Sequence, residues 1–266
     1  MSMRERRSPN FDARNGAVRF VVLHYTGMQD AETALKRLCD PAPQAGAYPG
    51  PWQAADTPPE QPLSRVSAHY LVAGDGVTWE LVPEAARAWH AGAGAWAGST
   101  TLNDHSIGVE IVNGGHDFGL PPYPEAQIEA VIALLRAVLA RHGLPPQAVI
   151  AHSDLAPARK QDPGEHFPWR RLAQAGVSIW PPAEPQAGRL PIGAGAQGEP
   201  VAHLQRLLAQ FGYALEASGR FDAHTELVVK AFQRRFLPER VDGVADGPVV
   251  QALSGLLGRV IAPDAP

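Results

Sequence analysis

Hydrophobic residues over the first two thirds of the chain occur in short runs that are separated by polar or glycine-rich turns. Runs of this length, rich in valine, isoleucine and leucine, are typical of β-strands rather than helices. They span residues 18–24, 66–72, 77–82, 106–112 and 149–152. A Gly-Asp-Gly sequence at residues 74–76 separates the second run from the third, which predicts a hairpin.

Residues 123–142 follow a different period, with apolar side chains on one face of a helix. Pro124 suits the first position of that helix, and Gly143 suits the position just after its end. Strand-like runs that alternate with helical segments predict an α/β fold in which one mixed β-sheet is flanked by helices.

The last third of the chain has only helical patterns. Apolar stripes at residues 200–211, 222–236 and 247–260 predict three short helices that close into a small bundle. A segment rich in proline and glycine precedes them and is typical of a linker. The predicted organisation is an α/β domain over residues 14–180, a linker over 181–198 and a helical domain over 199–260.

Residues 40–62 carry seven prolines within the α/β region. We expect a long loop here, because strand-like runs flank the segment. Loops of this length are usually functional or disordered. The segment is therefore interpreted either as the rim of a substrate groove or as a disordered insertion.

Composition and charge narrow the possible functions. The 266 residues carry a formal net charge of −4 and no basic block follows residue 7, so nucleic acid and anionic membranes are not expected partners. No apolar run is long enough to span a membrane, and no secretory signal is visible, which leaves the cytoplasm or export to the periplasm by another route. Cys39 is the only cysteine, which excludes an intramolecular disulfide and a cysteine-based zinc cluster.

Two histidines and an aspartate are candidate metal ligands. His24 and His152 each end a strand-like run, and Asp162 follows ten residues after His152. Two imidazoles and one carboxylate leave a fourth tetrahedral position open for water, which is typical of a catalytic zinc site. The metal lowers the pKa of its bound water to about 7 and so makes hydroxide available. Spacing alone leaves open the alternative that both histidines are structural.

Lys160 lies close to the candidate carboxylate ligand. Pro163 favours an extended conformation at Asp162, and residues two apart in an extended segment point the same way. Lys160 and Asp162 then face one site, where an ammonium group suits the stabilisation of negative charge during carbonyl hydrolysis. The alternative is a surface salt bridge.

Glu110 is a candidate general base. It lies in the run at 106–112, on the opposite face from Val109 and Ile111. Glutamate is depleted in strands and is rarely buried without a partner, so a position beside a metal-activated water would explain it. The alternative is the solvated face of an edge strand.

Five ordered motifs support the hydrolytic interpretation. They are His-Tyr-Thr at 24–26, Val-Ser-Ala-His-Tyr-Leu-Val at 66–72, Ala-Trp-His-Ala-Gly at 88–92, Asn-Asp-His-Ser-Ile-Gly-Val-Glu-Ile-Val-Asn at 103–113 and His-Ser-Asp-Leu-Ala-Pro-Ala-Arg-Lys-Gln-Asp-Pro-Gly at 152–164. This set resembles the zinc-dependent N-acetylmuramoyl-L-alanine amidases of type 2, which share the fold of peptidoglycan recognition proteins. The resemblance runs from about residue 18 to residue 180.

The resemblance implies a role for each candidate. It makes His24, His152 and Asp162 the ligands of a Zn²⁺ ion. Glu110 matches the catalytic glutamate of the family, and Lys160 matches its lysine near the scissile carbonyl. A mixed sheet flanked by helices is the implied fold.

Further residues are expected at the substrate groove. Trp89 and His90 match groove residues of the family. Tyr25 and Asn113 adjoin key positions and are expected to contact substrate. His69 is included as a groove residue, with the alternative that it packs beneath the cleft.

The end of the chain resembles the three-helix peptidoglycan-binding domain. The motifs that carry this similarity are Val-Ala-His-Leu-Gln-Arg-Leu-Leu with Phe-Gly-Tyr at 201–213, Gly-Arg-Phe-Asp-Ala-His-Thr at 219–225, Lys-Ala-Phe-Gln-Arg-Arg-Phe at 230–236 and Asp-Gly at 242–243. Such a module holds an enzyme on its polymer and raises the local substrate concentration.

The sequence as a whole therefore predicts a monomeric zinc amidase. Its expected substrates are peptidoglycan or anhydro-muropeptides, cut between N-acetylmuramic acid and L-alanine. Two alternatives are a peptidoglycan-binding protein without catalytic activity and a zinc endopeptidase that cuts within the stem peptide. The presence of all three candidate ligands with Glu110 and Lys160 favours the amidase.

Overall fold

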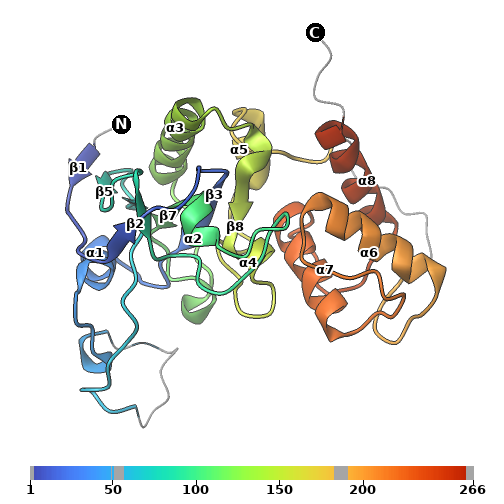
Figure 1. Ribbon diagram of the computed structural model, residues 1–266, viewed down its shortest axis with the longest axis horizontal. Coiled ribbons are helices and arrows are strands. Elements are labelled where there is room, and N and C mark those ends of the chain that lie inside the picture. Colours follow the sequence, from blue (N-terminus) through green and yellow to red (C-terminus); the bar gives the residue numbers. More distant parts are fainter. Residues whose placement is uncertain (1–2, 49, 51–56, 183–190, 262–266) are drawn as a thin grey trace.

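A mixed six-stranded sheet forms the centre of the α/β region in the computed structural model, which describes residues 3–48, 50, 57–182 and 191–261 (Figure 1). The strand order is β1-β5-β4-β7-β3-β8. The strands are β1 (Met3–Glu5), β3 (Phe20–Tyr25), β4 (Tyr70–Val72), β5 (Thr78–Glu80), β7 (Ser106–Ile111) and β8 (Val149–Ala151). The predicted mixed sheet is confirmed, since only β4 and β5 pair in antiparallel fashion, across the predicted hairpin.

The N-terminal residues contribute strands that the sequence did not predict. β1 pairs with β5 at the edge of the sheet, and β2 (Phe11–Ala13) pairs with β6 (Ala86–Ala88) in a separate two-stranded sheet. β1 and β2 have three residues each and are exposed, so they have no apolar pattern that would mark them. The sheet therefore includes chain that precedes the expected domain start at residue 14.

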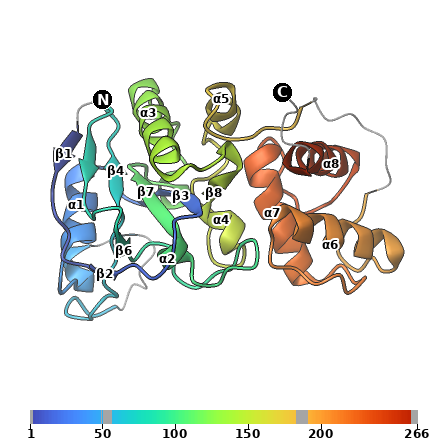
Figure 2. The ribbon, with the colours of Figure 1, turned by 45° about the horizontal axis from the view of Figure 1, so that its top comes forward.

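Two helices, α3 (Glu125–His142) and α5 (Trp169–Gln174), cover one face of the sheet (Figure 2). The apolar stripe of α3 packs on Ile107, Val109 and Ile111, which confirms the predicted face of that strand. α3 ends at Gly143, whose φ of 62° is the left-handed conformation that glycine favours. Pro124 precedes the helix as its N-cap instead of occupying its first position.

The opposite face of the sheet is covered at its two ends. α1 (Ala31–Cys39) packs over the side of β4 and β5 and ends at the cysteine. Asp30 caps this helix by accepting a hydrogen bond from the amide of Thr33. α4 (His152–Leu155) lies at the β8 end. Further short helices are α2 (Leu102–His105) and the 3₁₀ turns Ala45–Ala47, His116–Phe118 and Pro146–Ala148.

The three predicted C-terminal helices are present and pack together (Figure 1). They are α6 (Glu199–Phe211), α7 (Ala223–Phe236) and α8 (Gly247–Ile261). Their core is continuous with that of the α/β region through Trp96, Leu155 and Tyr213. None of the helices described is long and apolar enough to cross a lipid bilayer.

The two proline-rich segments are described in part. Residues 183–190 of the expected linker lie outside the described residues, and Ile192 already pairs with Ala245 of the helical unit. Residues 49 and 51–56 of the loop at 40–62 also lie outside. At the base of that loop, Gln44 pairs with Pro62.

Candidate active site

Three neighbouring parallel strands bring polar side chains to one edge of the sheet. β3 lies between β7 and β8, and His24 on β3 is in register with Glu110 on β7. His152 follows directly after the last residue of β8. Because the carboxyl ends of parallel strands meet at one edge, the three side chains come together from distant parts of the chain. The loop after α4 returns Asp162, whose carbonyl accepts a hydrogen bond from the amide of Ser153.

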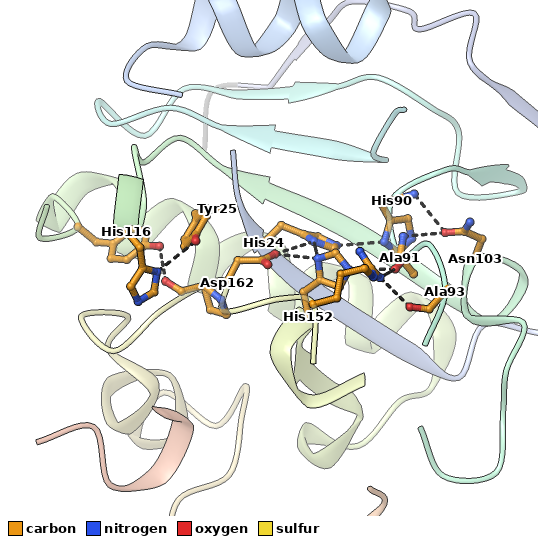
Figure 3. Close-up of polar contacts among 12 residues, drawn as sticks. His24, Tyr25, His90, Ala91, Ala93, Asn103, His116, His152 and Asp162 are labelled. Carbon is orange, nitrogen blue, oxygen red and sulfur yellow. Dashed lines mark hydrogen bonds and ion pairs between the residues drawn. The ribbon is translucent and has the colours of Figure 1, made fainter. Parts of the chain in front are cut away.

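His24, His152 and Asp162 point their potential metal-ligand atoms at one another (Figure 3). His24 Nδ1 lies 2.8 Å from His152 Nδ1 and 3.0 Å from Asp162 Oδ2. His152 Nδ1 lies 2.9 Å from the same carboxylate oxygen. All three residues are at most 4% exposed. The three predicted ligands are therefore brought together in a buried group that could hold a metal ion.

The far side of the His152 ring fixes which of its nitrogens carries a proton. His152 Nε2 lies 2.9 Å from the carbonyl oxygen of Ala91, which can only accept. Nε2 of the neutral ring therefore carries the proton, and Nδ1 presents a lone pair to the site. Hydrogen bonding of this kind behind a metal-binding histidine orients the ring.

A chain of hydrogen bonds likewise fixes which ring nitrogen of His24 carries the proton. The Ser106 hydroxyl donates to the carbonyl of Leu102, so its oxygen accepts from His90 Nε2 at 3.3 Å. His90 Nδ1 then has the lone pair that accepts from His24 Nε2 at 3.1 Å. His24 Nδ1 is left without a proton and faces the site.

The protonation states favour a cation between these groups. Burial and, to a smaller extent, the neighbouring His152 lower the pKa of His24 to about 4. Burial by itself raises the pKa of Asp162, but positive charge and hydrogen bonds at the facing nitrogens of His152 and His24 more than offset this and hold that pKa well below its usual range. Two nitrogen lone pairs and a carboxylate within 3.0 Å of one another repel unless a cation lies among them. The donor set therefore fits a metal ion.

Glu110 stands beside this group with an unsatisfied carboxyl oxygen. Its Oε2 atom is buried and has no hydrogen-bond partner among the residues that the structure describes. Burial and, to a smaller extent, the charge of Asp162 raise the pKa of Glu110 to about 8, although Lys160 opposes them. A buried carboxyl group with a raised pKa is suited to moving protons near neutral pH.

A cleft of about 720 Å³ opens onto the metal-binding group. Its walls come from segments far apart in the chain, and they include Arg37 of α1, Tyr48 of the proline-rich loop, Leu63 directly after that loop, and Leu227 of α7. Lys160 and Asp162 both line it, as their spacing predicted. The described part of the proline-rich loop thus forms part of the rim.

Comparisons with known proteins identify the family. A family model described as N-acetylmuramoyl-L-alanine amidase matches residues 14–165, which is more than half of the chain. The chain belongs to this amidase family. Over 260 residues it is 36% identical to the N-acetylmuramoyl-L-alanine amidase AmiD of Escherichia coli K12, which covers 91% of this chain and 83% of AmiD.

Solved structures of related amidases have the same fold. A complex of E. coli AmiD with anhydro-N-acetylmuramic acid-L-Ala-D-γ-Glu-L-Lys matches with a TM-score of 0.73 and 34% identity, over 93% of this chain and 92% of that one. AmpDh3 of Pseudomonas aeruginosa in complex with an anhydromuramic pentapeptide matches with a TM-score of 0.67 and 32% identity, over 91% and 92%. A second family model, described as "Putative peptidoglycan binding domain", matches residues 197–253, within α6, α7 and α8.

Three of the expected groove residues of this amidase line the cleft. They are Tyr25, Trp89 and His90. His90 also supports His24 from behind, as described above. Trp89 lies under the guanidinium of Arg65, at 5.1 Å from the ring centre.

Two expected groove residues, His69 and Asn113, do not line the cleft. His69 is fully buried beneath the sheet edge, where its Nδ1 accepts from the amide of Gly108, and burial with the charge of Arg14 lowers its pKa to about 3. Asn113 is 5% exposed, and its side chain donates to the carbonyl of Pro121 and accepts from the amide of Gly115. Neither residue lines the cleft, because both side chains are used to hold backbone.

The Ala-Trp-His-Ala-Gly motif of this amidase supports the metal-binding group in a way that the sequence did not reveal. His90 contacts His24, and the next residue, Ala91, accepts from His152. Asn103 Oδ1 accepts from the amides of both His90 and Ala91 and so holds the motif in place. The sequence contains one indication of this role, which is that residues 88–92 and Asn103 both belong to the five motifs of the family resemblance.

Proposed function

We propose that this protein hydrolyses the amide bond between N-acetylmuramic acid and L-alanine, with a Zn²⁺ ion held by His24, His152 and Asp162. One observation carries the proposal. The three ligand atoms lie within 3.0 Å of one another where the cleft meets the sheet, and the Glu110 Oε2 atom on the neighbouring strand has no hydrogen-bond partner among the described residues.

The donor set supports zinc as the metal. Two imidazole nitrogens and one carboxylate oxygen are the ligands of catalytic zinc sites that keep a position open for water or substrate. When bound, zinc polarises a carbonyl group and lowers the pKa of water. Ala91 and His90 would keep the two imidazoles in the orientation and tautomer that this ion requires.

Glu110 and Lys160 supply the rest of the chemistry. Glu110 accepts a proton from the attacking water and delivers it to the nitrogen of the departing L-alanine. The raised pKa of its buried carboxyl, about 8, suits it to hold that proton between the two steps. Lys160 lies on the cleft wall, and its ammonium group stabilises the negative charge that develops on the carbonyl oxygen.

The proposed substrates are peptidoglycan and its anhydro-muropeptide fragments. Support comes from AmiD and AmpDh3, whose structures contain anhydromuramic peptides. Tyr25 and Trp89 would contact the substrate from the cleft walls. The C-terminal helices would bind the polymer and raise the local concentration of scissile bonds.

Product analysis tests the proposal. Purified protein is incubated with intact peptidoglycan and with soluble anhydro-muropeptides, before and after removal of the metal with a chelator. Mass spectrometry should find free stem peptide that begins with L-alanine, and only in the metal-loaded samples. Fragments cut within the stem peptide would identify an endopeptidase instead, and binding without any release would identify a non-catalytic protein.

Glu110→Gln provides the matched control variant. The amide keeps the size of the side chain but cannot accept the proton, so turnover should fall by about a hundredfold or more. The variant should still bind one equivalent of zinc, measured by elemental analysis. Full activity in Glu110→Gln would remove this residue from the mechanism.

A further inference from the structure

The C-terminal helical unit makes hydrogen bonds to α4, the short helix that begins with the candidate metal ligand His152. Asp154 belongs to α4, two residues after His152, and its side chain is fully buried. Its Oδ1 atom accepts from the hydroxyl of Tyr213 at 2.7 Å. Its Oδ2 atom accepts from Arg235 Nη1 at 2.6 Å and from the amide of Ala151 at 2.9 Å. Two of these three donors come from the C-terminal helical unit.

Arg235 connects α7 to several elements of the α/β region. Its Nη2 atom donates to the carbonyl of Val149 on β8 at 2.8 Å, beside the bond from Nη1 to Asp154. The guanidinium lies 4.5 Å from the ring centre of Trp169 on α5, and the residue is 1% exposed. A buried ion pair adds little net stability compared with an apolar pair of the same shape, whereas its geometry is specific. The Arg235–Asp154 pair is therefore better explained as a contact that fixes the position of α4 than as one that stabilises the fold.

The preceding arginine reaches the other side of the cleft. Arg234 Nε donates to Glu165 at 2.8 Å, and Glu165 in turn lies 2.7 Å from His116 Nε2. His116 Nδ1 lies 3.1 Å from the hydroxyl of Tyr25, and both of these residues line the cleft. Consecutive residues of α7 thus support two separate parts of the candidate site.

α4 needs such external support. It has four residues, and a single helical turn does not hold its own conformation in water. The junction between β8 and α4 sets where His152 points. Asp154 ties this junction to the amide of Ala151, and the C-terminal helices hold Asp154.

We propose that the C-terminal helical unit is a structural part of the metal site, in which Tyr213 and Arg235 act as positioning residues for His152 through Asp154. This inference rests on the proposed function and goes beyond it. It assigns to these helices a second role besides holding the polymer. Loss of their contacts should loosen the metal ligand even when the substrate is a small soluble fragment that needs no polymer binding.

Metal affinity in the full-length protein tests this role. Zinc dissociation constants are measured by competition with a chromophoric chelator, and the visible spectrum of the Co²⁺-loaded protein reports the ligand geometry. Arg235→Gln should weaken zinc binding about tenfold and shift the Co²⁺ spectrum. Tyr213→Phe removes one hydrogen bond without changing shape, so it should have a smaller effect of the same sign. Arg235→Lys keeps the charge next to Asp154 and should recover part of the loss.

Gln205→Met is the matched control. Gln205 is fully buried, and its side-chain hydrogen bonds within the described part of the chain go to the helical unit, to residues such as Gly219 and Thr225. It should destabilise the helices but leave the zinc affinity and the Co²⁺ spectrum as in the wild type.

The possible results separate the two proposals. Wild-type zinc affinity and an unchanged Co²⁺ spectrum in folded Arg235→Gln and Tyr213→Phe would overturn the positioning role. If Arg235→Gln does not fold, Tyr213→Phe alone decides the question. Equal losses in Gln205→Met and Tyr213→Phe would also overturn the role, because they would show general destabilisation. A wild-type protein that binds no zinc would instead refute the proposed function.

Discussion

Gly108 leaves space for an imidazole ring directly beneath the candidate metal site. It lies on β7, two residues before Glu110 and on the same face. A Cβ atom at this position would lie 2.4 Å from Cγ and 2.7 Å from Nδ1 of His90. His90 can therefore reach His24 only because residue 108 has no side chain.

We predict that Gly108→Ala weakens metal binding. The added methyl group displaces the His90 ring, which then cannot accept the hydrogen bond from His24 Nε2. Loss of such a bond behind a metal-binding histidine costs about tenfold or more in affinity. The overpacking should also destabilise the fold by about 1–3 kcal/mol. Chelator competition measures the first effect and urea unfolding the second.

Gly74→Ala is the control for this substitution. Gly74 lies in the turn between β4 and β5, where the nearest atom to an added Cβ is Pro124 Cγ at 3.7 Å. The control should keep wild-type metal affinity. Unchanged affinity in Gly108→Ala as well would show that His90 does not support His24.

For individual residues, the sequence predicted the candidate metal ligands but not the groups that hold the two histidines in position. His24, His152 and Asp162 are chemically distinctive and lie in motifs. The supports are a backbone carbonyl at Ala91 and the absence of a side chain at Gly108, and neither has a signature in one sequence. His69 and Asn113 bond to backbone outside the cleft, because a polar residue next to a motif can hold backbone as well as substrate.

Between elements, the partly buried carboxylate of Glu84 joins the turn after β5 to the end of α3. Glu84 accepts from Arg141 and from the Tyr70 hydroxyl, and it contacts His142 Nε2 at 2.8 Å. Burial raises the pKa of Glu84, but these three hydrogen bonds outweigh it and lower the pKa to about 2. The ionised group therefore ties the last turn of the helix to two strands.

We predict that Glu84→Gln loses stability in a pH-dependent way. The folded-state pKa is depressed from 4.5 to about 2, so the carboxylate stabilises the fold above pH 4.5 and this contribution disappears as the pH falls towards 2. Glu84→Gln should be about 2 kcal/mol less stable than the wild type at pH 7, allowing for solvent screening of a partly exposed pair. Urea unfolding of both metal-free proteins from pH 7 to pH 3 should show the difference shrinking. A difference that stays constant with pH would assign the loss to packing.

The apolar pattern around an element, more than its length, decided which parts of the fold the sequence could predict. β4, β5 and β8 have three residues each, but they lie in apolar runs that predicted them. β3 and β7 have six residues and α3 has eighteen, so their periodicity was visible. β1, β2 and β6 have three residues each and form through pairing with distant chain, which no local pattern encodes. The same holds for α4, whose conformation depends on contacts with the C-terminal helices.

For the molecule as a whole, the sequence predicted two domains joined by a linker rich in proline and glycine, and it could not show how the domains meet. The apolar faces of the C-terminal helices are consistent with an independent bundle. In the structure, the same apolar cluster includes Phe20 and Val22 of β3, Trp96 and the C-terminal helices. The contact depends on residues such as Arg235 and Asp154, which lie 81 positions apart and have no shared motif.

This continuity predicts that the protein unfolds as one unit and that metal removal destabilises all of it. The metal-binding group lies in the α/β region, but the shared core and the buried Arg235–Asp154 pair couple that region to the helices. Zinc at a thousandfold excess over its dissociation constant adds about 4 kcal/mol. We therefore expect a single calorimetric transition, raised by on the order of 10 °C by zinc, that coincides with the loss of helical circular dichroism. Tyr213→Phe should lower this midpoint without splitting the transition. A second transition that zinc and chelators leave unmoved would show instead that the C-terminal helices fold independently.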